Sequence, residues 1–130
     1  MVFVDTNVFV YAVGRPHPLR EPARALLRER VAAGTALATS AEVLQELLHV
    51  YLPVGRSETL DAALTLADDL TTVLPVDASD VRAARDLVAS HPGLGARDLL
   101  HLAVAARHGA SEMLSFDRAL VAAFGAARNG

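Results

Sequence analysis

The segment Val2-Phe3-Val4-Asp5-Thr6-Asn7 decides the fold class of this chain, because a run of three β-forming residues ends abruptly at a carboxylate. A short apolar run without a polar face is typical of a central strand that is covered on both sides. In open parallel sheets, ligands bind beyond the carboxyl ends of the strands. Asp5 therefore marks the edge of the predicted sheet at which we expect a functional site.

Strands and helices alternate along the rest of the chain. Further strands are predicted at residues 35–39, 73–76 and 112–116, and Pro75 favours an edge position for the second of these because it lacks an N–H. Apolar residues at helical spacing predict helices at residues 20–33, after the caps Ser40 and Ser57, at 78–90, at 98–108, and a last short one after Asp117. We therefore expect an α/β fold of three layers, with a central, mostly parallel sheet flanked by helices.

Length and composition exclude several classes of function. The 130 residues fit a single domain, and the absence of cysteine excludes disulfides, thiolate nucleophiles and zinc-finger sites. All twelve basic residues are arginine, which excludes lysine-dependent sites such as the P-loop. A net charge of −3 does not suit a generally basic nucleic-acid-coating protein. With no visible signal peptide or membrane span, we expect a cytoplasmic protein.

Four acidic residues fall where the predicted sheet would gather them. Asp5 and Asp117 follow predicted strands, Asp98 opens a helix, and Glu46 lies within an apolar helix. Each alone is explained by a turn, a helix cap or a solvated helix boundary. Together they would repel one another by roughly 4 kcal/mol per pair at 4 Å and an effective dielectric constant near 20. A cation would relieve this repulsion, and oxygen ligands suit Mg²⁺ or Mn²⁺.

The segments around these acids resemble PIN-domain ribonucleases. The opening Val2–Phe9 is similar to the first acidic segment of that family, and three later segments resemble the others in order: 43–48, 97–103 and 114–118. The small size resembles the toxin of a VapBC-type toxin–antitoxin pair. The resemblance covers nearly the whole chain and implies a metal-dependent endoribonuclease that cleaves RNA.

The resemblance also implies roles for individual residues and partners. Asp5 and Asp98 would be the Mg²⁺ ligands, with Mn²⁺ possible, and Glu46 and Asp117 would complete the catalytic acidic set. Three neighbouring donors would fix the carboxylate rotamers, as metal sites require: Thr6, Asn7 and Ser115. Family members bind a small antitoxin protein and commonly form homodimers. We expect the same partners here, and no membrane.

Several alternatives stay open at this stage. Glu42 competes with Glu46 as the second acid, but its place in the first helical turn suits a structural role. His101 lies three residues after Asp98, close enough to hydrogen-bond it, so a packing or orienting role is favoured over metal ligation. Candidate RNA-phosphate contacts are Arg15, Arg97 and Arg118. Apolar side chains that suit a dimer or antitoxin contact, or the core, are Leu44, Leu48, Tyr51 and Leu52.

Two other functions compete with the ribonuclease. A non-catalytic RNA- or protein-binding module would keep the fold without the reaction, but the complete set of four acids argues against a decayed site. A metal-dependent phosphatase is weaker still, because the second aspartate and the lysine that its common version requires are missing.

Overall fold

A four-stranded parallel sheet forms the centre of the protein in a computed structural model, which describes residues 1–129. The strand order is β3-β2-β1-β4. The strands are β1 (Val2–Val4), β2 (Leu37–Ser40), β3 (Thr72–Leu74) and β4 (Glu112–Leu114). Every pairing is parallel, so the carboxyl ends of all four strands meet at one edge of the sheet.

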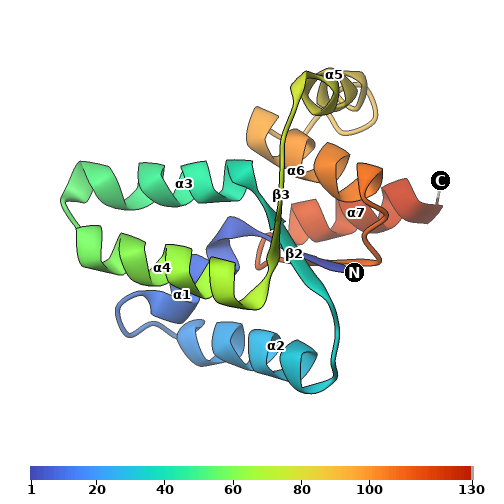
Figure 1. The fold of residues 1–130 in the computed structure, drawn as a ribbon. Coiled ribbons are helices and arrows are strands. Elements are labelled where there is room, and N and C mark those ends of the chain that lie inside the picture. The colour runs from blue at the N-terminus through green and yellow to red at the C-terminus, as the bar shows by residue number, and fades with distance from the viewer. Residues whose placement is uncertain (130) are drawn as a thin grey trace.

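Helices cover both faces of the sheet (Figure 1). The first four lie on one side: α1 (Thr6–Val13), α2 (Arg20–Ala32), α3 (Ala41–Tyr51) and α4 (Ser57–Leu70). The other three lie on the opposite side: α5 (Ala78–Asp86), α6 (Ala96–Arg107) and α7 (Arg118–Asn129). A short 3₁₀ turn, η1 (Leu52–Val54), follows α3. The predicted three-layer α/β fold is confirmed.

The apolar strand at the N-terminus forms the middle of the core, as its sequence predicts. Phe3 and Val4 are fully buried, and β1 has a neighbour on each side. The edge position predicted for the strand near Pro75 is also confirmed, because β3 pairs only with β2 within residues 1–129, although β3 ends at Leu74, before the proline. Gly34 and Gly109 follow helices with φ of 72° and 69°, the left-handed conformation expected after a helix.

Some boundaries differ from the sequence prediction. α5 ends at Asp86 instead of continuing to residue 90, because the N–H groups of Leu87 and Val88 turn back to carbonyls only three residues earlier. β4 ends at Leu114, two residues early, and α7 is twelve residues long instead of short. α4 has no side-chain cap, since Ser57 is its first residue and Arg56 occupies the cap position.

An ion pair between the buried Asp80 and the partly exposed Arg107 joins α5 to α6. The carboxylate of Asp80 is 1% exposed and accepts two hydrogen bonds from Arg107, 2.6 Å from Nε and 2.9 Å from Nη2. Asp80 also accepts a hydrogen bond from the Asp77 N–H, which completes a capping box at the start of α5. This pair fixes α5 against the helix that carries Asp98 and His101. No helix within residues 1–129 is long and apolar enough to cross a membrane.

Replacing Asp80 should destabilise the protein in a pH-dependent way. The hydrogen bonds from Arg107 hold the pKa of Asp80 below its ordinary value, so the pair contributes stability above about pH 4 and loses it as the pH falls through the lower, folded pKa. We expect Asp80→Asn to lower the unfolding free energy by about 2 kcal/mol at pH 7, and by much less near pH 3. Urea unfolding at both pH values measures the difference. Asp86→Asn, an exposed acid in the same helix, is the control, and an equal loss at both pH values would contradict the assignment.

Candidate functional site

All four acids selected from the sequence line one cavity at the carboxyl edge of the sheet. Asp5 follows β1, Glu46 lies on α3, Asp98 lies in the first turn of α6, and Asp117 follows β4. The cavity they line, called the acidic cavity below, has a volume of about 350 Å³. Two strand ends and two helices that are distant in the sequence therefore supply one cluster of carboxylates.

Asp5 lies deepest of these acids, at 5% exposure, and also caps α1. Its Oδ1 accepts a hydrogen bond of 2.7 Å from the Thr6 N–H, and its Oδ2 accepts one of 2.6 Å from the Ser115 hydroxyl. Burial raises the pKa of Asp5 above its ordinary value, and these hydrogen bonds only partly oppose that rise. The native state thus holds a carboxylate in a place that disfavours its charge.

The three predicted orienting residues form a hydrogen-bonded network around the acids. The Thr6 hydroxyl donates to Glu46 Oε2 at 2.7 Å, and the Asn7 amide donates to the Ser115 hydroxyl at 3.2 Å. That hydroxyl in turn accepts the Asp117 N–H at 3.0 Å. The network joins the segment after β1 to the segment after β4, so it fixes the relative positions of three of the acids.

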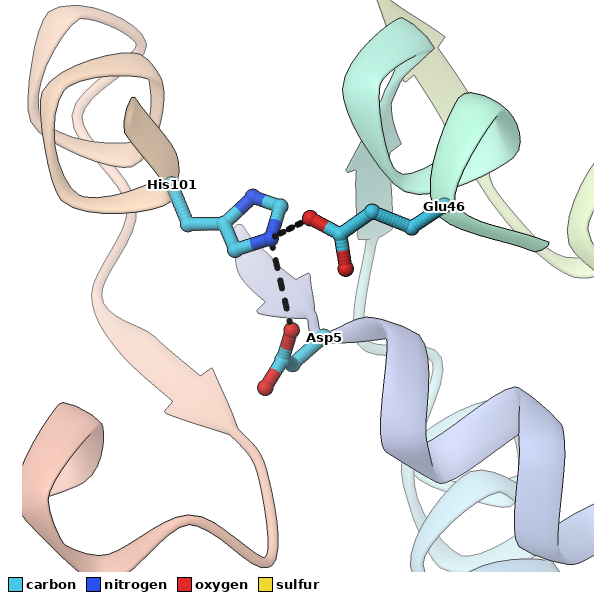
Figure 2. Close-up of side chains that lie close together, drawn as sticks. All are labelled: Asp5, Glu46 and His101. Carbon is cyan, nitrogen blue, oxygen red and sulfur yellow. Dashed lines mark ion pairs between the residues drawn. The ribbon is translucent and has the colours of Figure 1, made fainter. Parts of the chain in front are cut away.

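His101, which the sequence placed beside Asp98 with an orienting role, contacts two other acids of the cluster. It is 1% exposed, and its Nε2 lies 2.8 Å from Glu46 Oε1 and 3.6 Å from Asp5 Oδ1 (Figure 2). The hydrogen bond to Asp98 suggested by its spacing is absent from the described residues. The 2.8 Å contact is close but poorly aligned, so Glu46 Oε1 and both imidazole nitrogens lack a well-formed hydrogen bond within residues 1–129.

Charge governs the protonation of this cluster. Burial and the charges of Asp117 and Asp5 raise the pKa of Asp98. Burial alone would lower the pKa of His101, but its carboxylate neighbours outweigh burial and raise it. Burial would raise the pKa of Glu46, yet His101 and Thr6 together lower it. One imidazolium cannot neutralise four carboxylates, so the cluster has a deficit of positive charge.

The donor atoms present fit a divalent cation. Ligand atoms of Asp5, Glu46 and His101 all lie within 4.8 Å of one another, and Glu46 Oε1 has no well-aligned donor. Two carboxylates and an imidazole suit Mn²⁺ as well as other first-row metals, and the further carboxylates of Asp98 and Asp117 add the oxygen ligands that Mg²⁺ prefers. Either ion would offset the charge deficit.

The remaining sequence candidates lie in different places. Glu42 is half-buried and does not line the acidic cavity, whereas Glu46 does. Arg97 lies near enough to lower the pKa of Glu46, while Arg15 lines a neighbouring cavity. Of the apolar residues considered for a protein contact, Tyr51 belongs to the core, Leu44 is half-buried, and Leu48 and Leu52 are exposed.

Comparison with known proteins identifies the family to which this chain is similar. The PIN domain family model matches residues 2–124. Ribonuclease VapC23 of Mycobacterium tuberculosis is 58% identical over 124 residues, which cover 95% of this chain and 98% of that protein. Ribonuclease VapC13 of the same organism is 41% identical, covering 91% of each chain.

Solved structures share the fold at low sequence identity. VapC20 of Mycobacterium tuberculosis, described as a sarcin-ricin loop cleaving toxin, superimposes with a TM-score of 0.77 at 21% identity over 95% of each chain. FitAB bound to a DNA fragment gives a TM-score of 0.69 at 23% identity, over 96% of this chain and 91% of that one.

The charge deficit predicts how the metal-free protein responds to pH. Because the folded pKa values of Asp5 and Asp98 are raised, stability falls as the pH rises from about 4 through them. The raised pKa of His101 acts in the same direction, since its contribution is present below about pH 6.5 and is lost as the pH rises through the folded value. In EDTA, the melting temperature should therefore be a few degrees higher at pH 5.5 than at pH 8.

Two variants test whether the acidic cluster causes this change of melting temperature with pH. Asp98→Asn should have a higher melting temperature than the wild type at pH 8 without metal, because the substitution removes repulsion between like charges. Asp68→Asn, an exposed acid of α4, should melt as the wild type does. Equal melting temperatures for Asp98→Asn and Asp68→Asn would show that the cluster is not strained by charge.

Proposed function

This chain belongs to the PIN-domain family, and we propose that it acts as a VapC-type endoribonuclease that cleaves RNA with the help of a divalent metal ion. The observation that carries the proposal is the convergence of Asp5, Glu46, Asp98 and Asp117 on one cavity at the carboxyl edge of the sheet. Relatives that are 58% and 41% identical over nearly their whole length are named ribonucleases.

We assign a different role to each pair of acids in the cavity. We assign Asp5 and Asp98 as Mg²⁺ ligands, with Mn²⁺ as the alternative ion, and Glu46 and Asp117 as the residues that complete the catalytic set. When bound, the ion would stabilise charge on the phosphodiester and lower the pKa of a water molecule. The lowered pKa of Glu46 keeps its carboxylate ionised at neutral pH, so we assign it the role of orienting the attacking water.

The neighbouring polar residues keep these carboxylates in place. Ser115 and the Thr6 N–H hold the two oxygens of Asp5, and the Thr6 hydroxyl holds one oxygen of Glu46. The Asn7 amide carbonyl accepts the Phe116 N–H at 3.1 Å, which steadies the segment leading to Asp117. Such contacts set the orientation that a metal site requires, and losing one typically weakens a site by about 10- to 100-fold.

The partners follow from the same assignment. We propose that a cognate antitoxin protein binds the chain and that the chain forms a homodimer. The structural neighbours VapBC2 of Rickettsia felis and FitAB were each solved bound to a DNA fragment, and their paired names agree with the antitoxin partner that we propose. A cytoplasmic location suits a protein with an RNA substrate.

Metal binding and RNA cleavage should depend on the same carboxylates. A ligand that binds only the native state adds about 2.7 kcal/mol of stability at 100 times its dissociation constant. Mg²⁺ or Mn²⁺ should therefore raise the melting temperature of the wild type but not that of Asp98→Asn. Asp98→Asn and Asp5→Ala should cleave a mixed RNA at least about 100-fold more slowly, measured by gel assay, while Asp68→Asn should cleave normally.

Two other outcomes would argue against the proposed function. Metal binding with RNA binding but no cleavage by any form of the protein would favour a non-catalytic binding module. Unchanged cleavage in Asp5→Ala would contradict the assignment of the acidic cavity as the active site.

A further inference from the structure

A second cavity continues from the acidic cavity. It has a volume of about 280 Å³ and is called the tyrosine cavity below. Its distinctive lining residues are Tyr11, Arg15, His17, Tyr51 and Arg56. The two cavities share Val10, Tyr11 and Val50, so one side of each is built from the same residues.

The geometry of two helices explains why these cavities adjoin. On α1, Tyr11 lies four residues after Asn7, and on α3, Val50 lies four residues after Glu46, so each pair shares a helix face. α1 and α3 are in contact with each other. The helix that Asp5 caps ends at Gly14, nine residues later and about 13.5 Å along its axis. The space between the two helices therefore runs from carboxylates at one end to arginines at the other.

The wall of the tyrosine cavity carries an ordered aromatic stack. The rings of Tyr11 and His17 lie 4.7 Å apart at an angle of 31°, and Phe116 packs against Tyr11 edge-on at 5.5 Å. The Leu19 N–H donates to His17 Nδ1 at 3.0 Å, which fixes the orientation of the imidazole. Flat, fixed aromatic surfaces of this kind are the platforms on which single-stranded nucleic acids stack their bases.

Polar groups in the same cavity lack partners in the protein. Neither Arg15 nor Arg56 forms an ion pair with another residue in the part of the chain that the structure describes. Tyr51 is 3% exposed, and its buried hydroxyl has no hydrogen-bond partner among residues 1–129. A buried hydroxyl without a partner costs stability, so a ligand that supplies a hydrogen bond there is favoured. The two guanidinium groups suit phosphate oxygens.

We propose that the tyrosine cavity binds one nucleotide of single-stranded RNA next to the phosphate that is cleaved. Its base stacks on Tyr11, its phosphate contacts Arg15 and Arg56, and the Tyr51 hydroxyl hydrogen-bonds its base or ribose. The cavity volume of about 280 Å³ suits one unstacked nucleotide. This assignment rests on the proposed function, because the substrate strand must extend from the acidic cavity.

Binding of a fluorescein-labelled RNA pentamer tests the stacking surface directly. The experiment uses the full chain with Ca²⁺ in place of Mg²⁺, and fluorescence anisotropy gives the dissociation constant. Tyr11→Leu keeps an apolar side chain but loses the ring, and should bind about 5- to 100-fold more weakly. Tyr11→Phe keeps the ring and should bind as the wild type does. A pentamer without bases should bind the wild type and Tyr11→Leu equally.

Intrinsic fluorescence supplies a second readout. The chain has two tyrosines and no tryptophan, and both tyrosines line this cavity. Tyrosine emission of the wild type should therefore fall when the unlabelled pentamer binds. Unchanged emission at saturation would place the RNA elsewhere and overturn the proposal.

Salt dependence tests the phosphate contacts. Replacing Arg56 by serine should reduce the slope of log affinity against log salt concentration by about 0.7, the value for one phosphate contact to a single strand. Arg82→Ser, in the exposed surface of α5, is the matched control and should leave the slope unchanged. Equal slopes for Arg56→Ser and Arg82→Ser would show that Arg56 does not contact the strand.

The outcomes separate this proposal from the function on which it rests. If the wild type cleaves RNA in Mg²⁺ or Mn²⁺ but Tyr11→Leu and Tyr11→Phe bind the pentamer equally, the ribonuclease assignment stands and the nucleotide site is wrong. If Tyr11→Leu binds weakly as expected but no metal supports cleavage, the nucleotide site stands and the catalytic assignment is wrong. A wild type that does not bind the pentamer at low salt contradicts the nucleotide site.

Discussion

The burial of the Asp5 carboxylate at the end of the central strand is the constraint on which the rest of the site depends. A carboxylate at 5% exposure is stable in the native state only if nearby groups compensate its charge. Ser115 and Thr6 supply hydrogen bonds, and the imidazole of His101 lies 3.6 Å away. Because these partners come from the segments after β4 and β1 and from α6, compensating one charge also fixes three parts of the chain.

The distribution of charge explains how a protein of net charge −3 can act on a polyanion. Its carboxylates gather where a divalent cation would reverse their sign for an approaching phosphate. Arg15 and Arg56, which form no ion pair within residues 1–129, lie in the adjoining cavity with the aromatic rings of Tyr11 and His17. In this account, local placement of charge governs substrate binding, and the negative total does not prevent it.

The sequence predicted those parts of the structure that depend on local pattern. The strand at Val2–Val4 and the positions of Asp5 and Asp117 beyond strand ends follow from short apolar runs in a parallel sheet. The sequence placed His101 beside Asp98, but its contact with Glu46 could not be found this way, because that contact joins α6 to α3. The tyrosine cavity was missed for the same reason, since α1, the segment after it, and the end of α3 each supply part of its wall.

The central claim is that the carboxylate cluster is built to hold a divalent cation. Anomalous diffraction from a crystal of this protein grown with Mn²⁺ tests it most directly, because the signal locates the ion without assuming any ligand. We predict a peak in the acidic cavity within bonding distance of Asp5 and Asp98. An anomalous map that shows well-occupied Mn²⁺ ions at other positions but no peak in this cavity would contradict the account.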